Sequence, residues 1–257
     1  MHFTRKIKFF SYKSTLIFLL FVYINQGSCQ SYPGWFLNQI DINCGSTAVG
    51  FAERSFNKDT SAIKLAFSNA CYKFAQHENM DIQVYQTHFT TGIGTAQMDN
   101  NCYIHFDSSI VEQFKRSLKI LDILFNPNFL AVIIGKSECE GIIKNKITCD
   151  KETEPLWVKG EYNNDNEYFY AIGSAPEYYY EKSSWMEAEN VAIKNLSSSC
   201  YTQIRSVQRK DIVIDEIKEQ SYNVHLNRVQ VVARWRDIKN KVFSVLVRVP
   251  KGKIYPN

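Results

Sequence analysis

The sequence predicts an α+β fold of two tandem modules, each a helix packed on a small antiparallel sheet with a C-terminal β-hairpin. Three patterns predict it: a strand followed by a helix from Glu167 to Cys200, a weaker copy of that unit from Ser46 to Tyr72, and a pair of apolar runs that ends each copy. Helices in such an arrangement cover one face of the sheet. We therefore expect two layers in each module.

Residues 1–29 are predicted to be a secretory signal peptide. Basic residues precede an apolar run from Leu16 to Ile24, and small residues ending at Cys29 follow it. This order is typical of an export signal, and the run is too short for a stable membrane span. Two outcomes stay open: ordinary cleavage that leaves Gln30 as the new N-terminus, or cleavage before Cys29 with acylation of that cysteine.

The charge of the chain is balanced once the signal is set aside. The whole chain has 30 Lys+Arg and 26 Asp+Glu, and residues 1–29 hold four basic side chains and no acidic ones, which leaves 26 of each sign. A balanced chain lacks the positive field that phosphate backbones require. Nucleic acid is therefore not an expected partner.

Six cysteines follow the signal. An even number in an exported chain permits three disulfides, but the sequence does not choose among the pairings, and buried free thiols are the alternative. These cysteines are Cys44, Cys71, Cys102, Cys139, Cys149 and Cys200.

The first module is predicted to span residues 30–136. Its apolar patterns and turn residues predict elements in a fixed order. These are a strand at 47–52, a helix that contains Ala62, Leu65, Ala66 and Asn69, a strand from Ile82 to Phe89, a short helix from Ser108, and a hairpin from Ser117 to Gly135.

The second module is predicted to span residues 155–257, after a polar linker at 137–154 that a bond between Cys139 and Cys149 would close. A strand at 168–175 is followed by a helix that starts at Ser184, because Ser184 and Glu187 have the spacing of a capping box. The stretch 211–219 fits a helix or a strand. The last element is a hairpin from Val229 to Val249, in which Val229, Val231, Ala233 and Trp235 form one apolar face.

The two modules align as an internal duplication. The first strands match at an offset of 123, and Ala62 and Ala66 match Ala188 and Ala192 at an offset of 126. We assign the difference of three residues to a longer loop in the second copy. Trp35 and Trp157 precede the first strand of each copy and are expected to close one end of each core.

The second copy resembles a known family. The run Tyr170-Ala-Ile-Gly-Ser-Ala, the Ser184-Trp185 pair and the helix with Ala188, Ala192 and Leu196 are similar to the LPP20 lipoprotein family and to the N-terminal domain of the flagellar outer-membrane assembly protein T. The resemblance covers residues 157–251, and more weakly 35–136. It implies a bacterial envelope protein of the periplasm or outer membrane, without catalytic residues or a cofactor to carry over. Gly27-Ser28-Cys29 also resembles the end of a lipobox, with Gln26 in place of the usual aliphatic residue.

Other motifs give little sign of chemistry. Cys102 and His105 form an isolated C-x-x-H, with His88 as a third ligand type nearby, but a zinc site requires three or four convergent ligands. Glu187 and Glu189 are interpreted as first-turn residues that favour the helix dipole. The chain has no nucleophile elbow and no P-loop. We predict no catalytic, metal or cofactor site.

The tyrosine-rich loop is the candidate binding site. Tyr178, Tyr179 and Tyr180 are consecutive, so a loop cannot turn all of them inward, and tyrosine is enriched at recognition surfaces. We expect these residues to bind a partner, with packing against the helix as the alternative.

These observations predict a non-enzymatic envelope protein of the LPP20 type that assembles with or binds another envelope component. A membrane would be contacted only through an acyl anchor. The competing prediction is an envelope hydrolase with an unrecognised site. Clustered carboxylates or histidines with shifted pKa values in a deep cleft would favour the enzyme, and a shallow aromatic surface would favour binding.

Overall fold

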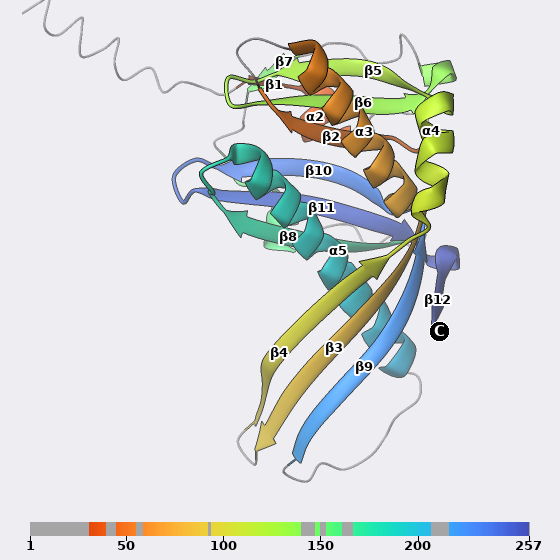
Figure 1. Ribbon diagram of the computed structural model, residues 1–257. Coiled ribbons are helices and arrows are strands. Elements are labelled where there is room, and N and C mark those ends of the chain that lie inside the picture. The colour runs from red at the N-terminus through yellow and green to blue at the C-terminus, as the bar shows by residue number, and fades with distance from the viewer. Residues whose placement is uncertain are drawn as a thin grey trace, which may run out of the picture. The chain divides into compact units, whose positions relative to one another are not determined.

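The structure is a computed structural model, shown in Figure 1. It describes residues 31–39, 45–54, 59–91, 94–139, 147–149, 153–160, 167–206 and 216–256. Helices and antiparallel sheets alternate along these residues, so the predicted α+β class is confirmed. Cys29, Cys44 and the side chains of His88 and Cys149 lie outside the described part of the chain.

The first three-stranded sheet contains β2 (Ala48–Glu53), β6 (Phe129–Lys136) and β5 (Leu118–Phe125), in that order. Strands β5 and β6 form the hairpin predicted around Asn126. Strand β6 is buried along nearly its whole length, which agrees with its unbroken apolar run because both faces of the sheet are covered. Helix α3 (Asp59–Glu78) covers one of those faces.

The second three-stranded sheet contains β8 (Tyr168–Pro176), β11 (Val242–Pro250) and β10 (Gln230–Asp237). Its order is that of the first sheet, with the opening strand on one edge and the second strand of the hairpin in the centre. Helix α5 (Glu181–Ser206) packs on β8 and β11. The same order of strand, helix and hairpin is expected of two copies of one unit.

One glycine in each sheet lets the helix lie directly on the strand. A Cβ on Gly50 would lie 2.1 Å from the carbonyl oxygen of Ala66, and a Cβ on Gly173 would lie 2.2 Å from that of Ala188. The next helical turn meets the same glycine through Ala70 in α3 and through Ala192 in α5. Only a residue without a side chain allows this approach.

These contacts correct the predicted helix alignment. Ala66 and Ala70 correspond to Ala188 and Ala192 at an offset of 122, so the predicted offset of 126 is wrong by one helical turn. Small residues that recur every four positions look alike after a shift of one turn, which explains the error. From glycine to first alanine the first copy uses 16 residues and the second 15, so the second connection is not longer.

A four-stranded sheet joins the two halves of the chain. Its order is β12 (Ile254–Pro256), β9 (Glu216–Asn227), β3 (Asn79–Thr91) and β4 (Gly94–His105). The long strands β3, β4 and β9 run side by side in Figure 1. Strand β3 confirms the strand predicted from Ile82, and β9 shows that the ambiguous stretch ends as a strand.

A β-bulge interrupts each hairpin at the corresponding place. The register shifts at Leu121 in β5 and at Val232 in β10, an offset of 111. Because a bulge adds one residue to one strand, the side chains beyond it change face. The predicted continuous apolar face of β10 is therefore wrong. Val231 pairs with Val247, whereas Arg234 pairs with Val245, so both side chains are on the face that packs against α5.

A continuous hydrophobic core cluster includes side chains from both halves. Phe36, in the short helix α2 (Gly34–Leu37), is at its centre and its ring lies 5.4 Å from the ring of Trp185 and 6.1 Å from that of Phe51. Trp35 is also buried, and its indole N–H donates to Asp122 at 2.7 Å. Trp157, in the 3-10 helix η4 (Leu156–Lys159), is only half-buried.

The remaining elements of the described chain are short. The predicted helix after Ser108 is present as the 3-10 helix η2 (Ser108–Ile110) and helix α4 (Val111–Ser117). The predicted linker contains the 3-10 helix η3 (Ser137–Cys139) and the strand β7 (Ile147–Cys149), which pairs with β1 (Ser31–Pro33). The last 3-10 helix is η5 (Lys251–Lys253).

Candidate binding surface

The three predicted binding tyrosines lie in the turn between β8 and α5. Tyr179 is 94% exposed, and Tyr178 and Tyr180 are each exposed by nearly half. Helix α5 starts at Glu181, one turn before the predicted start at Ser184. The Ser184 hydroxyl instead accepts the backbone N–H of Tyr178 at 2.8 Å, which holds the turn against the helix.

The tips of both hairpins lie at the same end of their sheets as this turn. Glu177 N–H donates to the Lys241 carbonyl at 2.9 Å, which fixes the β10–β11 tip beside the turn. Lys182 Nζ lies 2.9 Å from Glu53 Oε1 at the end of β2, the strand end that pairs with the start of β6. Each tip exposes a large apolar side chain. We name the resulting surface the tyrosine end, and it consists of Phe125, Tyr178, Tyr179, Tyr180 and Ile238.

Cations surround the tyrosine end. Lys182 Nζ lies 5.8 Å from the centre of the Tyr180 ring, and the Arg54 guanidinium lies 6.0 Å from the centre of the Phe125 ring. Lys241 Nζ lies 3.6 Å from Glu177. The aromatic rings and the cations together form an amphipathic surface.

A group of polar side chains at the start of α5 supports the tyrosine turn from the inside of the protein. Glu181, the first residue of α5, accepts hydrogen bonds from the Tyr32 hydroxyl and, at 3.3 Å, from the Trp185 indole N–H. Arg236 of β10 forms ion pairs with Glu181, at 3.9 Å, and with Glu177. The turn is therefore anchored to α5, to β10 and to the start of the described chain.

A second exposed surface is the open face of the four-stranded sheet. A shallow hollow of about 510 Å³ lies there, lined by Gln83, Tyr85, Asn101, Tyr103 and His105. The two tyrosine rings meet edge to face, with their centres 6.0 Å apart. Another hollow of about 530 Å³ lies where α5 approaches β4, with Cys102 and Lys194 among its lining residues.

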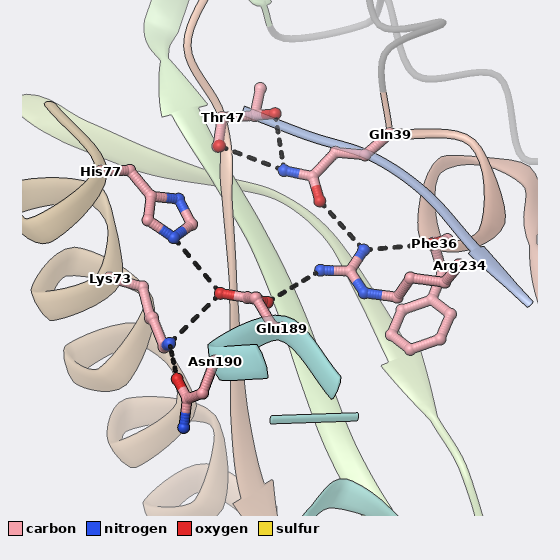
Figure 2. A network of polar contacts seen from close by, with 8 residues as sticks. All are labelled: Phe36, Gln39, Thr47, Lys73, His77, Glu189, Asn190 and Arg234. Carbon is pink, nitrogen blue, oxygen red and sulfur yellow. Dashed lines mark hydrogen bonds and ion pairs between the residues drawn. The ribbon is translucent and has the colours of Figure 1, made fainter. Parts of the chain in front are cut away.

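A buried ionic cluster joins α3 to α5 and β10, as Figure 2 shows. Glu189 of α5 is 2% exposed, and its Oε1 lies 3.2 Å from both Lys73 Nζ and His77 Nε2 of α3. Its Oε2 lies 3.5 Å from Arg234 of β10. Arg234 also donates to the Phe36 carbonyl at 3.1 Å and to Gln39 at 3.0 Å. The interpretation of Glu189 as a first-turn dipole residue is therefore wrong, because Glu189 lies in the third turn of the helix and pairs with Lys73 and Arg234, beside the imidazole of His77.

This cluster is suited to holding the fold together. Burial alone would raise the pKa of the Glu189 carboxyl, but Lys73, His77 and Arg234 outweigh that effect and hold its pKa well below the usual range. A carboxylate that stays ionised and lies between buried cations is a poor proton donor. It also lines neither of the two hollows. We therefore assign it a structural role.

The thiols and histidines of the described residues do not form a reactive centre. Burial raises the pKa of Cys71 to about 11 and that of Cys200 to about 12, so both thiols are protonated at neutral pH. Cys102 and His105 of β4 lie three residues apart in a strand and point to opposite faces. Among the described residues, no group of three or more His, Cys, Asp or Glu could hold a metal ion.

The cysteine pairing is partly defined. Cys139 forms a disulfide, and Cys71, Cys102 and Cys200 are free thiols. The partner of Cys139 is therefore Cys29, Cys44 or Cys149, whose side chains lie outside the described part of the chain. The predicted bond to Cys149 stays a prediction.

The three tyrosines are evident in the sequence, whereas the residues around them are not. Phe125 and Ile238 belong to hairpin tips more than fifty residues away on either side, and only the tertiary structure brings them to the turn. Arg234 and Arg236 carried one signal: two arginines that alternate within an apolar strand. A charged pair at that spacing marks a polar face or a buried ionic one, and the bulge at Val232 makes it the latter.

In the part of the chain that the structure describes, no helix has the length and apolar character of a bilayer-spanning segment. A comparison of the chain with models of known protein families found no match, and neither curated proteins nor solved structures gave a significant match.

Proposed function

We propose that this chain is a non-enzymatic binding protein of the bacterial cell envelope, built from two modules of the LPP20 type. Residues 1–29 direct its export to the periplasm or the outer membrane, and Cys29 either is removed with the signal or carries an acyl chain. The tyrosine end binds another envelope component.

The exposure of the tyrosine end is the observation that supports this proposal. Five large apolar side chains from three separate segments are exposed at one end, and monomeric soluble proteins rarely leave such groups together. Tyr179 is almost fully exposed, so it adds little to the fold. Tyrosine presents a large amphipathic area and loses little side-chain entropy when it is fixed in an interface. The ion pairs of Arg236 with Glu177 and Glu181 hold the two ends of the turn in place before any partner binds.

The arrangement of titratable groups supports a binding protein over a hydrolase. The carboxyl group with the strongly lowered pKa is Glu189, which is buried and paired with cations. The hollow on the four-stranded sheet is shallow and has tyrosine, amide and histidine side chains as its lining. A hydrolase requires an acid or base and its partner group at one site that substrate can reach, whereas His105 and Glu187 line different hollows.

A capture experiment with a matched control tests the proposal. The variant replaces Tyr178, Tyr179 and Tyr180 by Ser, and the control replaces Tyr72, Tyr85 and Tyr103, which are similarly exposed elsewhere, by Ser. Each immobilised protein is incubated with a detergent extract of bacterial envelopes, and the retained components are compared with those of the wild type. We expect the first variant to lose components that the control retains, with a thermal unfolding midpoint within a few degrees of the wild type. If the turn variant retains the same envelope components as the control, the tyrosine end is not the binding surface.

A further inference from the structure

The described chain begins beside the tyrosine end. Tyr32 is buried, its hydroxyl donates to Glu181, and its ring packs edge to face on Trp185 with the centres 6.1 Å apart. Glu181 directly follows Tyr180 in the sequence. The point where the N-terminal part of the chain joins the fold is therefore the base of the tyrosine turn.

Chain length limits how far a membrane attachment can lie from this point. Cys29 precedes Tyr32 by three residues, and three extended residues span at most about 11 Å. Cys29 is the residue of this stretch that could carry an acyl chain. Such an acyl chain would draw the tyrosine end to the membrane surface.

The chemistry of the tyrosine end fits the bilayer interface. Tyrosine is enriched where the hydrocarbon meets the headgroups, because its ring is apolar and its hydroxyl remains hydrated. Lys182, Arg236 and Lys241 compensate Glu53, Glu177 and Glu181 at the base of the turn, and Arg54 adds a further positive charge beside Phe125. A small positive excess around apolar side chains suits a surface of anionic lipid headgroups.

We propose that the tyrosine end inserts into the headgroup region of a phospholipid bilayer, with Tyr178, Tyr179 and Tyr180 as the inserted side chains. This inference rests on the proposed function and names the envelope component that the surface binds. The bilayer contact is made by the folded protein itself, so it does not require the acyl chain. The acyl chain, where present, strengthens the contact by tethering the same end.

The first test measures vesicle binding without any anchor. The chain from Gln30 to Asn257 is mixed with vesicles of phosphatidylethanolamine and phosphatidylglycerol, and the co-floating fraction gives a partition coefficient. We expect the wild type and the control with Ser at Tyr72, Tyr85 and Tyr103 to bind equally. The variant with Ser at the three turn tyrosines should bind roughly tenfold more weakly, since it loses the apolar area that enters the interface.

The second test holds the protein at the membrane by other means. The same chain is tethered through an N-terminal histidine tag to vesicles that contain a nickel-chelating lipid. Amide hydrogen exchange of the tethered protein is compared with that of the protein free in solution. We expect slower exchange in residues 177–182 and 237–241 and unchanged exchange in residues 101–105, which belong to the open sheet face. Unchanged exchange in the turn of the tethered protein would overturn the inference.

The outcomes separate this inference from the proposed function. A wild type that neither co-floats nor shows protection, but captures a protein through the three tyrosines, overturns the membrane assignment and retains the proposed function. A turn variant that matches the wild type in capture, flotation and exchange overturns both.

Discussion

Glu189 joins the two halves of the chain through buried polar contacts. It binds Lys73 and His77 from the first half and Arg234 from the second, and the cluster is shielded from water. Removing one partner from such a cluster leaves uncompensated buried charges, which destabilises far more than the loss of a surface ion pair. The fold therefore depends on the carboxylate remaining ionised.

We expect Glu189→Gln to lower the free energy of unfolding at pH 7 by about 3–5 kcal/mol. The pKa of Glu189 is lower in the folded protein than in the unfolded chain, so its stabilisation is complete above the ordinary value of 4.5 and is lost as the pH falls towards the folded pKa. The difference in the free energy of unfolding between wild type and variant should therefore become smaller below pH 4.5. Urea unfolding at a series of pH values measures this difference.

Glu187→Gln is the matched control for this prediction. Glu187 lies two residues earlier on the same helix and is only half-buried. We expect its substitution to change the free energy of unfolding by less than about 1 kcal/mol at any pH. If the difference in the free energy of unfolding between wild type and Glu189→Gln stays constant from neutral to acid pH, the assigned ion pairing is wrong.

At the scale of elements, the close contact between strand and helix is the repeated feature. We expect Gly173→Ala to destabilise the protein by about 3 kcal/mol or more, because its Cβ would meet backbone atoms of α5 that cannot rotate away. Gly252→Ala is the control, since a Cβ there has no heavy atom within 4 Å. Thermal and urea unfolding compare the two. Equal stability of both variants would show that α5 does not lie on β8 as described.

The sequence predicts these elements well because their signals are local. Strand β8, helix α5 and both hairpins follow from apolar periodicity and turn residues, and they appear close to the predicted bounds. The alignment of the two helices does not follow from the same signals, because alanines at a spacing of four give the same pattern after a shift of one turn. The bulge at Val232 leaves no local signal, so the face occupied by Arg234 could not be predicted.

The same distinction applies to the candidate site. Three adjacent tyrosines are visible in the sequence, and a loop cannot bury all of them. Phe125 and Ile238 become part of the surface only because both hairpins end at that side of their sheets. The ionic cluster likewise depends on tertiary structure, since Lys73 and Glu189 are 116 residues apart. Neither could be derived from spacing.

At the scale of the molecule, the two halves share one core cluster and one sheet. We expect residues 155–257 expressed alone not to unfold cooperatively, because β9 would lose β3 and the core would be open to water. Circular dichroism and urea unfolding of this fragment provide the test. Mixing it with residues 30–154 should restore a cooperative transition, and a fragment that is stable alone would mean that the second module is an independent domain.

The pairing of β3 with β9 also determines when the protein can fold. Thr90 pairs with Glu216, so this ladder cannot begin until 126 residues after Thr90 have been made, and the pair of Asn79 with Asn227 completes it. Closing so long a loop slows folding, and β3 keeps an unpaired edge until then. A chain that leaves a ribosome or a translocation channel from its N-terminus thus exposes its first half unfinished for most of its passage. For the export that we propose, late completion keeps the chain unfolded while it passes a translocation channel, and the pairing of β3 with β9 follows once the last strands have emerged.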